Sequence, residues 1–162
     1  MNIPDIKLPR IVVIGGGFAG ISLIKQLQKE AVQVVLFDRH NYHTFQPLLY
    51  QVSTAGLEPD SIAYPLRKVF KNNKHFHFRL AKVEHINTSE KQIETSIGKL
   101  SYDYLVIATG TRTNFFGNKN IEEKSMPMKT IPQALNIRSL MLENIEAADI
   151  SEDEDERKRL LN

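Results

Sequence analysis

The sequence predicts an α/β fold with a parallel sheet, and three observations support this class. Residues 11–14 are an unbroken β-branched run that leads into a glycine-rich turn. Residues 18–30 then place apolar side chains at helical spacing, and residues 34–37 form a second continuous apolar run. Parallel strands need a crossover connection and are buried on both faces. The pattern therefore predicts a right-handed βαβ unit.

The segment after this unit, residues 39–60, has no clear apolar period and is rich in aromatic and amide side chains. A loop of this length inside a compact domain is more often functional than idle. Beyond it, apolar side chains at helical spacing predict a short helix over residues 61–71, which Pro65 interrupts in an early turn.

The next part of the chain predicts further strands. Residues 76–86 alternate weakly between apolar and polar side chains, which predicts that this segment contains a strand. Residues 91–95 and 98–100 predict a short antiparallel excursion. Residues 105–107 form a third continuous apolar run, which predicts another buried strand of the parallel sheet.

The C-terminal part predicts one long helix. Thr130 occupies an N-cap position with Gln133 in the capping-box position. An apolar stripe follows along this helix. Its members are Ala134, Leu135, Met141, Leu142, Ile145 and Ala148.

The charge-rich residues 151–159 predict a linker or the solvated start of another helix. We expect residues 1–116 to form the N-terminal part of a nucleotide-binding domain. Residues 117–162 are expected to form a connecting segment and a helix that leads to another domain.

Composition narrows the classes of function. The formal net charge of +2 is too small to indicate nucleic acid or an anionic membrane as a partner. The absence of cysteine excludes disulfides, thiolate metal ligands and a dithiol redox centre within these residues. The start has no secretory signal, and no run approaches the roughly 18 apolar residues of a membrane span. The default expectation is a cytoplasmic or peripheral protein.

The histidine pairs His40 with His43 and His75 with His77 have short spacings. No carboxylate or thiolate set accompanies them, so we expect ordinary polar positions and no metal site.

Gly15, Gly17 and Gly20 fit the pattern G-x-G-x-x-G directly after a predicted strand and at the start of a predicted helix. The first glycine permits the sharp turn, and the second leaves no Cβ between the backbone and a pyrophosphate. The third lets helix and strand pack closely. In such a setting the first N–H groups of the helix face an anion, so the turn predicts a dinucleotide site. The alternative is a turn in which the glycines serve packing alone.

Asp38 ends the second predicted strand, 18 residues after Gly20, about the distance needed to reach a ribose hydroxyl. An acid at this position disfavours the 2′-phosphate of NADP. The neighbouring Arg39 has two open interpretations: contact with the adenosine phosphate, or a solvated side chain. The βαβ unit alone does not distinguish FAD from NAD.

Two further segments suggest a family. Residues 102–110, which end in Ala108-Thr109-Gly110, resemble the second fingerprint of flavoproteins that have two dinucleotide-binding domains. Residues 38–52 resemble the corresponding region of type II NADH:quinone oxidoreductases, the single-subunit, non-proton-pumping NADH dehydrogenases. The helix that carries residues 134–138 and 146–148 also resembles this family. The resemblance runs from about residue 10 to 150 and implies a Rossmann-like FAD-binding domain.

Carried over residue by residue, the resemblance implies a set of contacts with FAD. The residues that would surround the FAD pyrophosphate are Gly15, Gly17, Phe18, Ala19 and Gly20. Asp38 would hold the adenosine ribose, and Val83 would touch the adenine. The residues that would flank the middle of the cofactor are Ala108, Thr109 and Gly110. Those that would lie nearer the isoalloxazine are Gln46, Pro47 and Leu48.

The resemblance implies hydride transfer from NADH to FAD and then reduction of a quinone in a respiratory chain. Because the cofactor supplies this chemistry, we nominate no catalytic side chain. A complete member would add a second glycine motif for NADH, a segment that completes the FAD domain, and a C-terminal amphipathic anchor. Such a protein would be a peripheral membrane protein on the cytoplasmic side of the inner membrane. A homodimer is one of the oligomeric states that the resemblance leaves open. We therefore expect this sequence to be a soluble N-terminal fragment that is inactive alone.

Two alternatives stay open from the sequence. One is another FAD-dependent pyridine-nucleotide oxidoreductase. The other is a non-catalytic Rossmann module that senses a nucleotide. The absence of cysteine weakens the sulfide:quinone and disulfide reductase alternatives, and residues 38–52 favour the quinone-reducing enzyme over a sensor.

Overall fold

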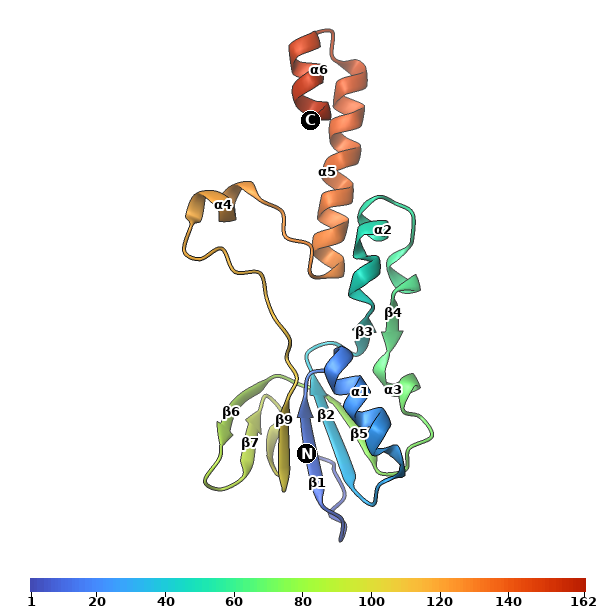
Figure 1. Cartoon of the computed structure of the whole chain (residues 1–162), viewed down its shortest axis with the longest axis vertical. Helices are drawn as coiled ribbons and strands as arrows, with labels where there is room; N and C mark the ends of the chain where they lie inside the picture. The colour runs from blue at the N-terminus through green and yellow to red at the C-terminus, as the bar shows by residue number, and fades with distance from the viewer. The chain divides into compact units, whose positions relative to one another are not determined.

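A computed structural model describes residues 1–162, which form two compact units. The first unit comprises residues 1–43 and 63–111, and the second comprises residues 44–62 and 112–162. The first unit holds a parallel sheet of four strands and an antiparallel sheet of three (Figure 1). This arrangement confirms the predicted α/β class with its antiparallel excursion. The expected division at residue 116 stays a prediction.

The parallel sheet has the strand order β5-β2-β1-β9. Its strands are β1 (Arg10–Ile14), β2 (Gln33–Asp38), β5 (Phe76–Leu80) and β9 (Tyr104–Ile107). The register sets Ile14 opposite both Phe37 and Ile107. The carboxyl ends of β1, β2 and β9 therefore lie level at one edge of the sheet, which is where α/β sheets bind their ligands.

The parallel sheet is covered on both faces. Alternate residues such as Val13 and Leu36 pack on one face with Ile24 and Leu66, which belong to α1 (Phe18–Gln26) and α3 (Leu66–Val69). Helix α1 continues as a short 3₁₀ turn, η1 (Leu27–Lys29).

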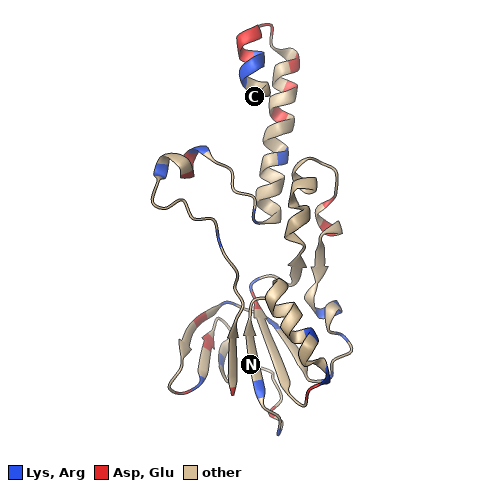
Figure 2. Ribbon diagram, viewed as in Figure 1, with Lys and Arg blue, Asp and Glu red and all other residues tan.

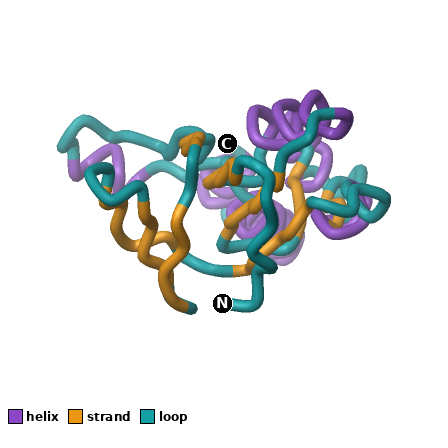
Figure 3. The backbone as a smooth tube through the Cα atoms, turned by 90° about the horizontal axis from the view of Figure 1, so that it is seen from below, coloured by secondary structure: helices purple, strands orange, loops and turns teal.

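The other set of alternate residues, such as Val12 and Phe37, packs with Ile93 and Leu100 of the antiparallel sheet. That sheet consists of β6 (Val83–Asn87), β7 (Gln92–Thr95) and β8 (Gly98–Ser101). Figures 1 and 3 show the layers from two directions. Burial on both faces explains the continuous apolar runs of β1 and β2.

The segment 76–86, which was predicted to contain a strand, holds β5 and most of β6, and these belong to different sheets. Another strand prediction needs correction. Strand β9 was predicted to be buried, but it is an edge strand, with Tyr104 64% and Ile107 63% exposed. Its apolar run is explained by contacts of Leu105 and Val106 with the two opposite cores.

The predicted helix over residues 61–71 is wrong in its first half. Residues Ala63–Pro65 form strand β4, which pairs with β3 (Tyr42–Thr44), and helix α3 begins only at Leu66. Proline lacks an N–H donor and biases the residue before it toward extended backbone, so Pro65 suits the strand end and the N-cap of α3.

The second unit is built mainly of helices. They are η2 (Gln46–Leu48), α2 (Leu49–Ser53), η3 (Pro59–Ser61), α4 (Lys119–Lys124), α5 (Ile131–Ile150) and α6 (Glu154–Leu161). Leu49, Val52 and Ile62 pack with Ala134 of α5 in its core. The predicted capping box at Thr130 and Gln133 is confirmed. None of the helices combines the length and hydropathy that crossing a membrane requires.

The apolar stripe of α5 is packed only in part. Ala134 and Ala148 are buried, whereas Met141, Leu142 and Ile145 are 45%, 50% and 51% exposed. The charge-rich end forms helix α6, in which acidic residues lead and basic residues follow (Figure 2). This order places charges of favourable sign at the two ends of the helix dipole.

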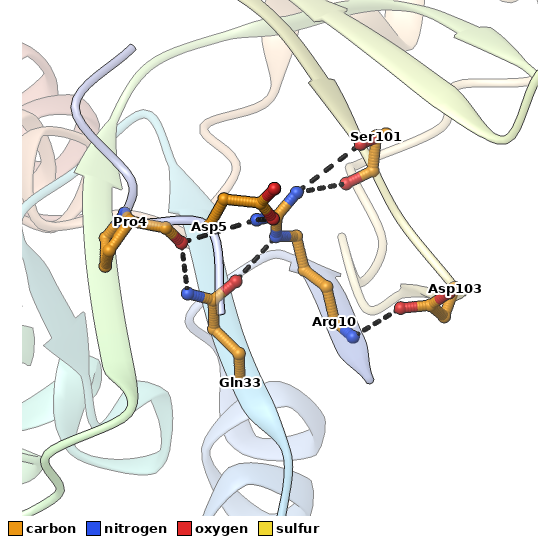
Figure 4. A network of polar contacts seen from close by, with 6 residues as sticks. All are labelled: Pro4, Asp5, Arg10, Gln33, Ser101 and Asp103. Atoms are coloured by element: carbon orange, nitrogen blue, oxygen red, sulfur yellow. Dashed lines mark hydrogen bonds and ion pairs between the residues drawn. The ribbon is translucent and has the colours of Figure 1, made fainter. Parts of the chain in front are cut away.

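Arg10 joins separate segments at the amino end of the parallel sheet (Figure 4). Its Nε donates to Oε1 of the fully buried Gln33 at 2.6 Å. Gln33 in turn donates from Nε2 to the Pro4 carbonyl at 2.8 Å. The Arg10 amide donates to the Asp103 carboxylate at 2.6 Å, and its guanidinium also contacts Ser101. This network ties the N-terminal segment and the start of β9 to β1.

We predict that Gln33→Met lowers the free energy of unfolding by about 1–3 kcal/mol, because it leaves the Pro4 carbonyl and Arg10 Nε without their buried partner. Urea denaturation checks this value. The matched control is Gln26→Met, since Gln26 is exposed on α1. Equal effects of the two substitutions would contradict the structural role of the network.

Candidate functional site

The two sequence motifs meet at the carboxyl edge of the parallel sheet. The Gly15 amide donates to the Phe37 carbonyl at 2.8 Å, and the Ala108 amide donates to the Ile14 carbonyl at 2.8 Å. The glycine turn after β1 and the Ala-Thr-Gly turn after β9 are therefore held side by side. The candidate site therefore lies at the carboxyl ends of β1, β2 and β9.

Gly15 and Gly20 are required by the packing of the backbone. Gly15 has φ +108°, and a Cβ on it would lie 2.7 Å from the Ala108 carbonyl carbon and 3.1 Å from Thr109 Cα. A Cβ on Gly20 would overlap the Gly15 carbonyl oxygen. Gly15 thus permits the contact between the two motifs, and Gly20 lets α1 pack directly on the turn.

Gly17 differs from both of these glycines. It is exposed, and a Cβ built on it would meet no atom within 4 Å. It is the N-cap of α1, which has no side-chain cap and no acidic residue in its first turn. The next two residues, Phe18 and Ala19, are exposed as well. The positive end of the helix dipole therefore borders open space, a setting that suits a phosphate group.

Asp38 lies half-buried at the end of β2 and faces the glycine turn. Its Oδ2 accepts from the Gly16 amide at 2.6 Å, and its Oδ1 accepts from the His40 amide at 2.8 Å. A carboxylate offers about four lone-pair sites, so these two bonds leave acceptor capacity for ribose hydroxyls. The neighbouring Arg39 is exposed, which is compatible both with contact with the adenosine phosphate and with a solvated side chain.

Gly16 and His43 belong to the site but were not predicted there. His43 Nδ1 lies 3.1 Å from the Gly16 carbonyl oxygen. The His43 ring also meets Phe18 edge-on, at 4.9 Å between centroids and an interplanar angle of 85°. A Cβ on Gly16 would lie 2.7 Å from Leu66 Cδ1. The run of three consecutive glycines was the one sequence feature that could have assigned Gly16 to the site. No feature of the sequence around His43 predicts that it lies there.

The remaining predicted contacts have different placements. Thr109 and Gly110 follow β9 and are exposed. Val83 begins β6, pairs with Thr95 and packs beside the core of the antiparallel sheet. The three residues assigned to the isoalloxazine lie in η2 of the second unit: Gln46, Pro47 and Leu48. All of these ligand contacts stay predictions.

One histidine and one arginine on β5 have lowered pKa values. Burial, followed by the charges of Arg79, His75 and Arg10, lowers the pKa of His77. Burial, followed by the charge of Arg67, lowers the pKa of Arg79. The polar groups at the glycine turn are backbone amides, the Asp38 carboxylate and the His43 imidazole.

Comparison with known proteins identifies similar sequences. The profile of the family described as pyridine nucleotide-disulphide oxidoreductase matches residues 9–156. The chain is 35% identical to the type II NADH:quinone oxidoreductase Ndh of Mycobacterium tuberculosis, an alignment that covers 94% of this chain and 34% of the relative.

Solved structures show the same similarity. The NDH2 of Plasmodium falciparum in complex with NADH superposes with a TM-score of 0.81 at 26% identity, covering 94% of this chain and 32% of that one. The sulfide:quinone oxidoreductase of Aquifex aeolicus gives a TM-score of 0.78 at 29% identity, covering 85% and 32%. The chain thus spans about a third of the length of these relatives.

We predict that Gly20→Ala and Gly17→Ala differ in their effect on folding. The added methyl group at Gly20 overlaps backbone, so it should lower the free energy of unfolding by about 1–3 kcal/mol or more. The methyl group at Gly17 meets no neighbour, so its cost should stay below about 1 kcal/mol. Urea denaturation of both variants tests the difference, and a reversed order would refute the packing assignment.

Proposed function

This chain belongs to the pyridine nucleotide-disulphide oxidoreductase family, and on that premise we propose that it is the FAD-binding part of a type II NADH:quinone oxidoreductase. The observation that carries the proposal is the junction of Gly15 with Ala108 and Thr109. It brings the glycine turn and the second flavoprotein fingerprint to one edge of the sheet. A domain that binds only NAD does not need this combination.

The residues of the turn fit a dinucleotide with a ribose and a pyrophosphate. The open space at Gly17 accommodates a phosphate group beside the first turn of α1. Asp38 keeps acceptor capacity for the ribose, and its negative charge disfavours a 2′-phosphate. Ala108, Thr109 and Gly110 would border the middle of the cofactor, with Gln46, Pro47 and Leu48 nearer the isoalloxazine. Val83 would touch the adenine.

Bound FAD would supply the chemistry, which is to accept hydride from NADH and to reduce a quinone. The task of this chain is to bind and orient the cofactor. NADH binding, quinone reduction, peripheral attachment to the cytoplasmic face of the inner membrane and a homodimer are proposals for the whole protein. They rest on the similarity to relatives of which this chain spans about a third.

A second candidate is a sulfide:quinone oxidoreductase, because a solved enzyme of that name matches with a TM-score of 0.78. The two candidates differ in their electron donor. A third, the non-catalytic nucleotide sensor, predicts NAD binding without a bound flavin.

We predict that Gly17→Ala weakens the binding of FAD to this chain by roughly tenfold or more, since the methyl group fills the space assigned to the pyrophosphate. Isothermal titration with FAD measures the effect. The control is Gly56→Ala, whose added Cβ makes ordinary contacts with Gln51. Unchanged FAD affinity of the folded Gly17→Ala variant would contradict the site.

We also predict that the whole protein containing this sequence carries FAD and oxidises NADH in the presence of a water-soluble ubiquinone analogue. The decrease in NADH absorbance measures the rate of NADH oxidation. A parallel assay tests sulfide as the electron donor in place of NADH. Turnover with sulfide but not NADH would favour the second candidate. Tight NAD binding by a flavin-free protein would favour the sensor.

A further inference from the structure

The peptide groups around Gly16 are held from two sides by side chains. The Gly16 amide donates to Asp38 Oδ2 at 2.6 Å. The Gly16 carbonyl lies 3.1 Å from His43 Nδ1. Asp38 is the acid that the motif predicts, whereas His43 comes from strand β3 and belongs to no part of the glycine motif.

The contact of His43 controls the orientation of one particular peptide group. The Gly16 carbonyl and the Gly17 amide belong to the same planar trans peptide, so they point in opposite directions. A bond that fixes the carbonyl therefore also fixes the direction of the Gly17 N–H. The same imidazole packs edge-on against Phe18, so His43 contacts the residues on both sides of Gly17.

The chemistry of the contact defines which nitrogen carries the proton. A carbonyl oxygen only accepts hydrogen bonds, so His43 must donate from Nδ1. In the neutral ring this leaves Nε2 without a proton. A phenyl ring at this position would keep the packing on Phe18 and lose the donor. An asparagine would keep a donor near Nδ1 and lose the ring.

We propose that His43 is a positioning residue of the FAD pyrophosphate site and acts by donating from Nδ1 to the Gly16 carbonyl. The proposal rests on the function proposed above. His43 does not touch the cofactor. It orients the Gly17 amide at the N-cap of α1, which lies at the space assigned to the pyrophosphate.

Two substitutions separate the donor from the ring. We expect His43→Phe to weaken FAD binding about 3- to 10-fold, the effect of one lost hydrogen bond. We expect His43→Asn to bind FAD within about twofold of the wild-type chain, because it restores the donor. His75→Phe and His75→Asn are the matched controls, since His75 is exposed and directly precedes β5, at the amino end of the parallel sheet. Both controls should keep the wild-type affinity. Titration calorimetry gives the affinities, and the melting temperature of each variant monitors folding.

The ¹⁵N chemical shifts of the His43 ring in the same chain without FAD provide a second readout. They should show the proton on Nδ1 of the neutral ring. A proton on Nε2 with a bare Nδ1 would overturn the proposed bond, whatever the affinities.

The affinities distinguish the two proposals. If the wild-type chain binds FAD and His43→Phe binds it with the same affinity, the positioning role is wrong and the proposed function stands. Equal losses in His43→Phe and His43→Asn also overturn it, since they assign the effect to packing. A wild-type chain that binds no FAD overturns the proposed function, and the positioning role fails with it.

Discussion

Backbone packing at Gly15 brings the carboxyl ends of β1 and β9 together, and the rest of the site depends on this approach. A side chain at Gly15 would occupy the same space as the Ala108 carbonyl group, and its φ of +108° suits glycine. The hydrogen bonds from Gly15 to Phe37 and from Ala108 to Ile14 then align three strand ends. Two motifs about 90 residues apart thereby become one surface.

The three glycines of the motif have different physical roles in this structure. Gly15 and Gly20 are needed for the fold itself, since both would place a side chain against backbone atoms. Gly17 is not needed for packing, because the space around it is open. The structure thus separates the glycines that build the turn from the glycine that leaves room for a ligand.

Local signals allowed the sequence to predict the βαβ unit, the antiparallel excursion and the capped start of α5. Continuous apolar runs, glycine spacing and the Thr130 capping box each act within a few residues. The pairing of β3 with β4 could not be predicted in this way. Nor could the contact between His43 and Gly16, which joins residues 27 apart in the chain. Periodicity identified the apolar stripe of α5, but it does not specify what covers each side chain.

The most direct test of the proposed FAD site is a crystal structure of this chain grown with FAD. We predict the pyrophosphate beside the Gly17 amide at the N-terminus of α1, with the adenosine ribose on the Asp38 carboxylate. Density for FAD at another place on the chain, or a phosphate-free turn in crystals saturated with FAD, would contradict it.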